Sequence, residues 1–356
     1  SYFSTSLKQN IILTHLRSSL EIFPWNILWG EGGAWYIWNA YRRACRRIEQ
    51  EGIEIVLSSH HPFSDHIIAW LLKRKYPHLI WIADFRDIRR EQTRPLDQVP
   101  DGEDAIEKRL LKKADLVTTV SAGLKRFLER WHDNVHVLYN GFSEPADENH
   151  PVGQQFFTLS YTGSIYPELQ DASMLFRALQ ELMAEGEIDR QNLQFITSGP
   201  DDVYWRELAF QYGLTDILVH RGLVSRDRAL KQQQNSHINV LLSWNYPSLK
   251  GILTSKLFEY LRVQRPILAL INGETDPEFE GIFEETGCGE VVYAWDEGSL
   301  HTIKENLMYY YNRWKHASEW SFQMSVDAFR WSRQFDRFLD RMDEEVGEKL
   351  SGKKSL

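Results

Sequence analysis

Short runs of apolar and β-branched residues alternate along this chain with longer segments of helical periodicity. Runs such as 79–83 and 116–120 are typical of strands buried on both faces of a sheet. The segments between them repeat their apolar residues every three to four positions, as crossover helices do. This alternation predicts an α/β protein in which helices cover parallel sheets.

The first half of the chain predicts one α/β layer. We expect its strands at 53–57, 79–83, 116–120 and 135–139, and its helices at 64–75, 103–114 and about 122–131. Ser121 is a favourable N-cap for the last of these helices. Before residue 53 only 10–16 has strand character, so we expect the opening strand and its glycine-rich loop to be either missing or diverged.

A second α/β series begins after 143–153, a segment with the Pro, Gly and acidic composition of a linker. Its strands are expected near 157–161, 193–197, 217–220, 238–242, 267–270 and 290–293. Six strands with intervening helices predict a complete doubly wound sheet. We therefore expect a first domain at 1–145, a second at 154–318, a terminal helix at 319–345 and a mobile tail at 346–356.

The terminal segment carries an apolar stripe that needs a partner surface. Its members are Trp320, Phe329, Trp331, Phe335, Phe338 and Met342. We expect this helix to cross back onto the first domain.

Composition excludes several classes of protein. A chain of 356 residues suits two domains, and 42% hydrophobic with 26% charged residues excludes extensive disorder. The net charge of -9 argues against binding nucleic acid through overall charge. No apolar run approaches the roughly 18 residues of a spanning helix, and Cys45 and Cys288 lack disulfide-framework or zinc spacing. We expect a cytoplasmic protein, at most peripherally associated with the inner face of a membrane.

Candidate catalytic residues lie where the first two clear strands are expected to end. His60 and His61 can donate to a ligand oxygen or shuttle a proton, or one of them can be a capped loop histidine. Asp84, Arg86 and Asp87 follow the next strand. There Arg86 either bridges the two acids in a structural network or holds an anionic ligand.

In the second half, glycines follow three successive predicted strands. These are Gly163, which precedes Ser164, then Gly199, which follows Ser198, and Gly222. One such glycine has little meaning, but three of them keep one edge of a sheet open for a ligand.

A loop then enters a helix whose N-terminal amides and positive dipole end suit a phosphate. Its candidate binding residues are Gly251, Thr254, Ser255, Lys256, Leu257 and Glu259. Lys256 adds a cation. Glu259 lies three positions later, where its carboxylate either accepts two ribose hydroxyls or forms a surface ion pair with Lys256.

The ordered set of these motifs resembles bacterial family 4-like glycosyltransferases of the GT-B fold, over about residues 35–340. The acceptor-side domain of that family is matched by IVLSSHHPFSDHIIAWLLKRKYPHLIWIADFRD, ADLVTTVSAGL and VHVLYNGF. Its donor-side domain is matched by YTGSIYP, FITSGP, HRGLVSR and TSKLFEYLRVQRPILAL.

This resemblance implies two Rossmann-like domains facing across a cleft, a nucleotide-sugar donor, retention of anomeric configuration, and no cofactor or bound metal. Of the family's Glu-x7-Glu pair, the ribose-binding second acid matches Glu259, whereas the sugar-binding first acid falls on Gly251. Ser164 stands where an Arg is common.

We therefore expect a hexosyltransferase that builds a cell-surface polysaccharide or glycolipid from a saccharide or lipid-linked acceptor. Ser255 and Lys256 stabilise the departing diphosphate, and His60 or His61 contacts the donor sugar or the acceptor. A nucleotide-sugar epimerase and a non-catalytic nucleotide-sugar-binding protein of the same fold are the alternatives. There is no Asp-x-Asp, HExxH, GxSxG or GxxxxGK[ST] motif, and the sequence specifies no oligomeric state.

Overall fold

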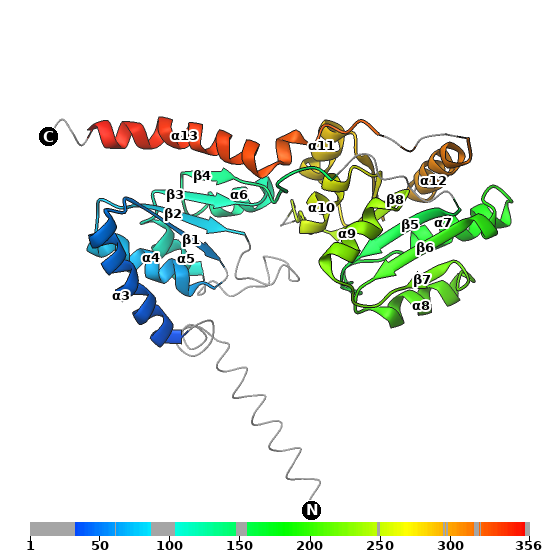
Figure 1. Cartoon of the computed structure of the whole chain (residues 1–356), viewed down its shortest axis with the longest axis horizontal. Coiled ribbons are helices and arrows are strands. Elements are labelled where there is room, and N and C mark those ends of the chain that lie inside the picture. Colours follow the sequence, from blue (N-terminus) through cyan, green and yellow to red (C-terminus); the bar gives the residue numbers. More distant parts are fainter. Residues whose placement is uncertain are drawn as a thin grey trace, which may run out of the picture. The chain divides into compact units, whose positions relative to one another are not determined.

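The structure, a computed structural model of the chain, divides into two compact units, Ser1–Val137 and Leu138–Leu356. It describes residues 33–60, 62–86, 104–146, 155–247, 250–294, 296, 298–316, 320 and 322–352, without the side chains of 104–107 and 343–352. Both units are α/β (Figure 1). The predicted fold class is therefore confirmed, whereas the expected strand at 10–16 lies outside the described residues.

The first unit is a parallel sheet with strand order β1-β2-β3-β4. Its strands are β1 Ile55–His60, β2 Ile80–Phe85, β3 Leu116–Thr119 and β4 Val135–Val137. Its helices are α3 Gly33–Glu51, α4 Ser64–Lys75, α5 Asp104–Leu111 and α6 Ala122–Leu128. Ser121 caps α6 as predicted, because its hydroxyl accepts the Leu124 amide at 3.1 Å.

Two strands of this unit continue beyond their predicted ends. β1 extends to His60 and β2 to Phe85, so residues expected in loops lie in the ladder, with Ser59 opposite Asp84. The polar residues continue the strands because their side chains bond to one another across the sheet. Alternation in β1 consequently buries Ser58 and His60 and leaves Ile55 and Leu57 exposed on this strand, which forms one edge of the sheet among the described residues.

The second unit contains the six predicted strands as one parallel sheet, in the order β10-β9-β8-β5-β6-β7. The strands are β5 Phe157–Thr162, β6 Leu193–Ser198, β7 Leu218–His220, β8 Ile238–Trp244, β9 Ile267–Asn272 and β10 Gly289–Tyr293. The α-helices are α7 Ser173–Ala184, α8 Asp202–Gln211, α9 Arg226–Gln234, α10 Ser255–Val263, α11 Pro277–Thr286, α12 Ser299–His316 and α13 Trp331–Gly352. The 3₁₀ turns are η2 Arg190–Asn192 and η3 Asp327–Phe329.

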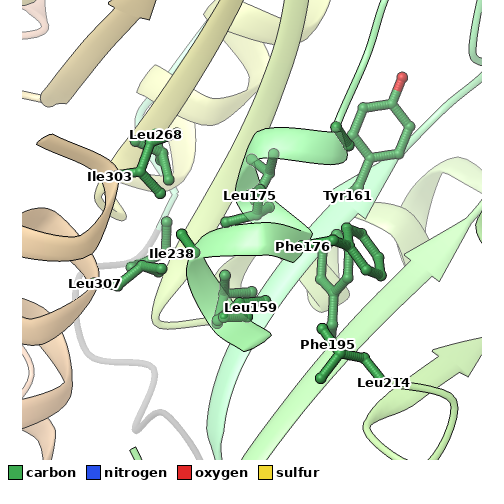
Figure 2. Packing of buried hydrophobic residues seen from close by; sticks show 14 of the residues in the cluster. Leu159, Tyr161, Leu175, Phe176, Phe195, Leu214, Ile238, Leu268, Ile303 and Leu307 are labelled. Atoms are coloured by element: carbon green, nitrogen blue, oxygen red, sulfur yellow. The ribbon is translucent and has the colours of Figure 1, made fainter. Parts of the chain in front are cut away.

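An aromatic cluster lies within the core of the second unit. Phe176, Phe195 and Tyr161 are fully buried among leucines and isoleucines from α7, α12 and the sheet (Figure 2). Trp205 of α8 packs on all three rings, with centroid separations of 5.0 to 6.2 Å. Burying each such side chain contributes about 1.5–3 kcal/mol to stability. Because Tyr161 lies near the carboxyl end of β5 and Phe195 lies within β6, this packing stabilises the position of both strands.

The ends of the predicted second domain need correction. Tyr139 and Phe142, expected in the first domain, pack with Phe329 and belong to the second unit. Trp320 and Phe329 precede α13 instead of lying on it, and Trp320 contacts His237 of the same unit at 4.7 Å. The terminal helix begins at Trp331 and continues through Gly352, within the segment expected to be a mobile tail. Its return to the first domain stays a prediction.

Candidate active site

The three strand-end glycines of the second unit form a continuous row across β5, β6 and β7. The Gly163 amide donates to the Ser198 carbonyl at 2.8 Å, and the Gly199 amide donates to the Gly222 carbonyl at 3.0 Å. All three have positive φ. A Cβ on Gly199 would lie 2.2 Å from the Gly163 carbonyl oxygen, so only glycine allows this close approach. The prediction that these glycines share one sheet edge is confirmed.

Lys256, near the start of α10, lies over Gly163, the first glycine of this row. A Cβ on Gly163 would lie 2.3 Å from Lys256 Cε. Lys256 Nζ donates to Tyr161 Oη at 2.6 Å and to the Ser164 carbonyl at 3.0 Å. It also lies 4.5 Å from the centre of the Tyr161 ring. The structure therefore brings Gly163, Ser164 and Lys256 together.

The environment of Lys256 alters its protonation. Burial lowers the pKa of Lys256 to about 8, while the carboxylates of Glu259 and Asp201 raise it by smaller amounts. The charged ammonium therefore predominates at neutral pH, but it is only partly solvated. An anionic ligand replaces that missing stabilisation, as a diphosphate arriving at this edge would.

The loop before α10 is held by the protein itself. The Gly251 amide donates to the buried Asp276 carboxylate at 2.6 Å, and Gly251 adopts φ of 75°. Thr254 is the N-cap of α10, yet its side chain makes no capping bond, and its buried Oγ1 has no partner among the described residues. The N-terminal amides of α10 are thus not capped by the Thr254 side chain, whereas exposed Ser255 stands beside them.

Two predicted binding residues serve the core. Leu257, on the inner face of α10, is fully buried in a hydrophobic cluster of the second unit. Ser198 is buried and donates its hydroxyl to Gln232 Oε1 at 2.7 Å, so it offers only its backbone to the sheet edge. The Gln232 amide in turn donates to Ser160 Oγ at 3.1 Å. This bond network fixes α9 against β5 and β6.

Glu259 lies on α10 and lines a cavity of about 410 Å³. Other lining residues include Arg226 and Asp227 at the start of α9, Arg262 on the next turn of α10, and Gly141. Among the described residues Glu259 forms no ion pair, so the alternative in which it pairs with Lys256 on the surface is not observed. Its carboxylate is available to hydroxyl donors.

In the first unit Asp84 is the centre of a polar layer across three strands. Its carboxylate accepts the Ser59 hydroxyl at 2.9 Å from β1 and the Thr118 hydroxyl at 2.7 Å from β3. Arg86 Nη1 lies 3.8 Å from the same carboxylate. These bonds give Asp84 a structural role within the sheet, and Arg86 lies beside it, whereas the catalytic roles of Asp84 and Arg86 stay predictions. His61 and Asp87 lie outside the described residues.

His60, expected in a loop, is the last residue of β1 and only 3% exposed. Its ring packs against Phe63, Phe85 and His66, with centroid separations of 5.8 to 6.1 Å. Burial lowers the pKa of His66 to about 3, and His60 contributes a smaller effect. His66 was not predicted as a site residue, although its place in the predicted helix 64–75, after a strand that contains Ser58, was an available signal. Their side chains bond at 2.7 Å.

Exposed aromatic side chains mark the beginning of α3. Trp35 is 80% exposed and Trp38 is 56% exposed. Tyr36 donates its hydroxyl to Asp65 at the start of α4 at 2.8 Å. Because α4 starts where β1 ends, this bond places the aromatic end of α3 near the carboxyl edge of the sheet. The abundance of tryptophan in the sequence was the available signal for such a surface.

The described part of the chain contains neither a candidate membrane-spanning helix nor a candidate metal site. None of its helices combines the length and apolar composition needed to cross a membrane. No group of three or more His, Cys, Asp or Glu side chains there is arranged to hold a metal ion.

Known proteins share sequence features with the first unit and share the fold of the chain. The profile of Glycosyltransferase Family 4 matches residues 14–144, and no curated protein sequence matches the chain. Sucrose-phosphate synthase from Thermosynechococcus elongatus superposes with a TM-score of 0.54 at 15% identity, over 88% of this chain and 79% of that one.

Two further solved structures share the fold. The lipopolysaccharide outer core galactosyltransferase WaaB has a TM-score of 0.52 at 13% identity, over 88% of this chain and 81% of its own. The pneumococcal O-GlcNAc transferase GtfA, solved with UDP and GlcNAc, has a TM-score of 0.52 at 11% identity, over 85% and 60%. The family profile matches part of the chain, mainly the first unit, and the solved structures share the fold of the chain, which is of the GT-B type with two Rossmann-like units.

Proposed function

We propose that the protein transfers a hexose from a nucleotide-sugar donor to a saccharide or lipid-linked acceptor of a cell-surface polysaccharide or glycolipid, with retention of configuration. The observation that carries this proposal is the placement of Lys256 over Gly163 at the open edge of the second sheet. An ammonium, a glycine row and helix N-terminal amides gather where a departing diphosphate needs positive charge.

The donor end would be read by one turn of α10. Ser255 and Lys256 meet the phosphates, and the Glu259 carboxylate accepts the two ribose hydroxyls. Tyr161 sets the position of Lys256. Its ring packs against Trp205 with a centroid separation of 5.0 Å, and its hydroxyl accepts a hydrogen bond from the Lys256 ammonium. Leaving-group charge is thus compensated by a side chain and by backbone dipoles, and we propose that no divalent ion is required.

The acceptor would bind the first unit. The exposed faces of Trp35 and Trp38 suit stacking against the C–H face of a sugar ring. Arg86, at the end of β2, and His61 are the polar groups that we assign to the acceptor or to the donor sugar. These assignments are consistent with saccharide acceptors, and no nucleic acid is expected to bind.

A non-catalytic role has one observation in its favour. Gly251 replaces the acid that contacts the donor sugar in this family, and its amide is already bonded to Asp276. A protein of this kind would bind nucleotide sugar without turnover, whereas an epimerase would convert it without acceptor.

The test has two steps. A thermal-shift screen across nucleoside diphosphates and nucleotide sugars identifies the donor, since a ligand that binds only the native state raises the melting temperature. Nucleotide release is then measured with and without oligosaccharide acceptors. Acceptor-dependent release supports transfer. Conversion of donor without acceptor, or tight binding without release, would instead establish one of the alternatives.

A further inference from the structure

A second cavity of the second unit, about 770 Å³ in volume, lies beside α9. Residues of β5 and β6, including Thr158 and Ile196, contribute to its lining together with residues of α9. Neither Lys256 nor Glu259 lines it. We call this cavity the α9 groove. It is separate from the residues assigned to the donor and has no role in the reaction described above.

The charge of the α9 groove is opposite to that of the chain. Arg221, Arg228 and Lys231 line it, and no acidic residue does. Within the described residues none of these three side chains forms an ion pair or a hydrogen bond. Residues 221–231 carry four basic side chains and one acidic one, in a chain of net charge -9. Three uncompensated cations around one cavity favour an anionic ligand.

Neutral hydrogen-bonding groups lie between these cations. Gln155, Gln194 and Asn235 line the groove, and their side-chain amides are not bonded to any other described residue. Each amide offers both donors and an acceptor, which suits hydroxyl groups better than phosphate oxygens, because phosphate only accepts. Arg228 and Lys231 lie three residues apart on one helix, so their side chains are neighbours along the groove.

We propose that the α9 groove binds an anionic oligosaccharide, a sugar chain that carries carboxylate or phosphate substituents. The cations pair with the substituents, and the amides bond to the hydroxyls between them. A volume of this size is within the range of about 300–1,000 Å³ for small-molecule sites. The proposed function motivates the choice of a saccharide, while the charge argument stands apart from it.

The experiment is calorimetric titration of the whole chain with a galacturonate tetrasaccharide. We expect binding that weakens when salt is raised from about 0.05 M to about 0.5 M. The double variant Arg228→Gln/Lys231→Gln should weaken it by roughly ten-fold or more, which is about 1.4 kcal/mol of binding free energy. The control Arg177→Gln/Lys315→Gln removes the same charge from α7 and α12, outside the groove, and should leave affinity unchanged.

Uncharged maltotetraose and inorganic tripolyphosphate are the comparison ligands. Weak binding of both supports an anionic saccharide site. If maltotetraose bound as tightly as the galacturonate, charge would not contribute to binding. If tripolyphosphate bound as tightly, the site would recognise anions in general and not a saccharide. No binding of the galacturonate, or equal loss in the control variant, would overturn the proposal. Nucleoside diphosphate affinity should be the same in all these proteins, so a failure here is distinct from a failure of the donor site.

Discussion

At the scale of single residues, the second unit depends on Lys256, whose ammonium is held by an aromatic ring, a phenol and a carbonyl oxygen. None of these groups carries a negative charge, so the ammonium keeps its capacity to pair with an anion. Burial lowers the pKa of Lys256 to about 8, close to physiological pH. Its charge is therefore sensitive to the conditions under which ligands bind.

This shift predicts a pH dependence of nucleotide affinity. Above pH 8 the free protein loses the Lys256 proton, so a nucleoside diphosphate should bind about ten-fold more weakly at pH 9 than at pH 7. The Lys256→Arg variant stays charged over this range, and its affinity should change little. Titrations of both proteins at several pH values check this. A parallel fall in both would show that another group titrates.

At the scale of elements, the glycine row predicts which backbone positions cannot accept a side chain. Gly199→Ala puts a Cβ against the Gly163 carbonyl at a φ of 154°, and should cost roughly 2 kcal/mol or more of unfolding free energy. Gly213→Ala is the matched control, because its φ is 65° and nothing lies within 4 Å of the new Cβ. It should cost about 1 kcal/mol. Urea unfolding of both variants checks this, and equal costs would contradict the packing of β5 against β6.

The junction of β5, β8 and the segment around Trp320 contains a second titrating group. His237 Nδ1 accepts the Thr158 amide at 2.9 Å, and burial lowers the pKa of His237 to about 3. The unfolded state, with the ordinary value near 6.5, takes up the proton first. Stability is therefore complete above pH 6.5 and is lost as pH falls, by about 2 kcal/mol at pH 5.

Unfolding of the wild type and His237→Gln at pH 7 and pH 5 measures this effect. The glutamine variant should lose less stability between the two pH values. His66, whose pKa burial also lowers to about 3, remains in both proteins as an internal reference. An identical loss in both would show that His237 does not contribute.

The elements show where sequence reasoning succeeded and where it failed. The six strands of the second sheet were predictable because their β-branched runs are bounded by Gly, Pro and Asn. The ends of β1 and β2 were not, because Ser59 and Asp84 look like loop residues until their bond across the strands is known. Lys256 and Glu259 were predicted as site residues because they lie three positions apart at the start of a predicted helix. Tyr161 was missed, because a tyrosine inside a strand gives no sign that its hydroxyl reaches a lysine 95 residues away.

At the scale of the whole molecule, the proposed function assigns the donor to one unit and the acceptor to the other. It predicts that a chelator leaves turnover unchanged, because Lys256 and the start of α10 take the diphosphate charge. Rates with and without chelator, once a donor and acceptor are found, check this. Loss of activity that magnesium or manganese restores would show that a metal ion stabilises the leaving group instead.

We propose that one turn of α10 in the second unit binds a nucleoside diphosphate, and calorimetric titration with UDP measures this binding. Bonds to a charged acceptor are worth about 1.5–3 kcal/mol each, so Glu259→Gln should weaken UDP binding by roughly ten-fold or more, with little change in melting temperature. Glu207→Gln, which removes the same charge from the exposed surface of α8, should bind like the wild type. An unchanged dissociation constant in Glu259→Gln, or an equal loss in Glu207→Gln, would show that Glu259 does not bind the nucleotide.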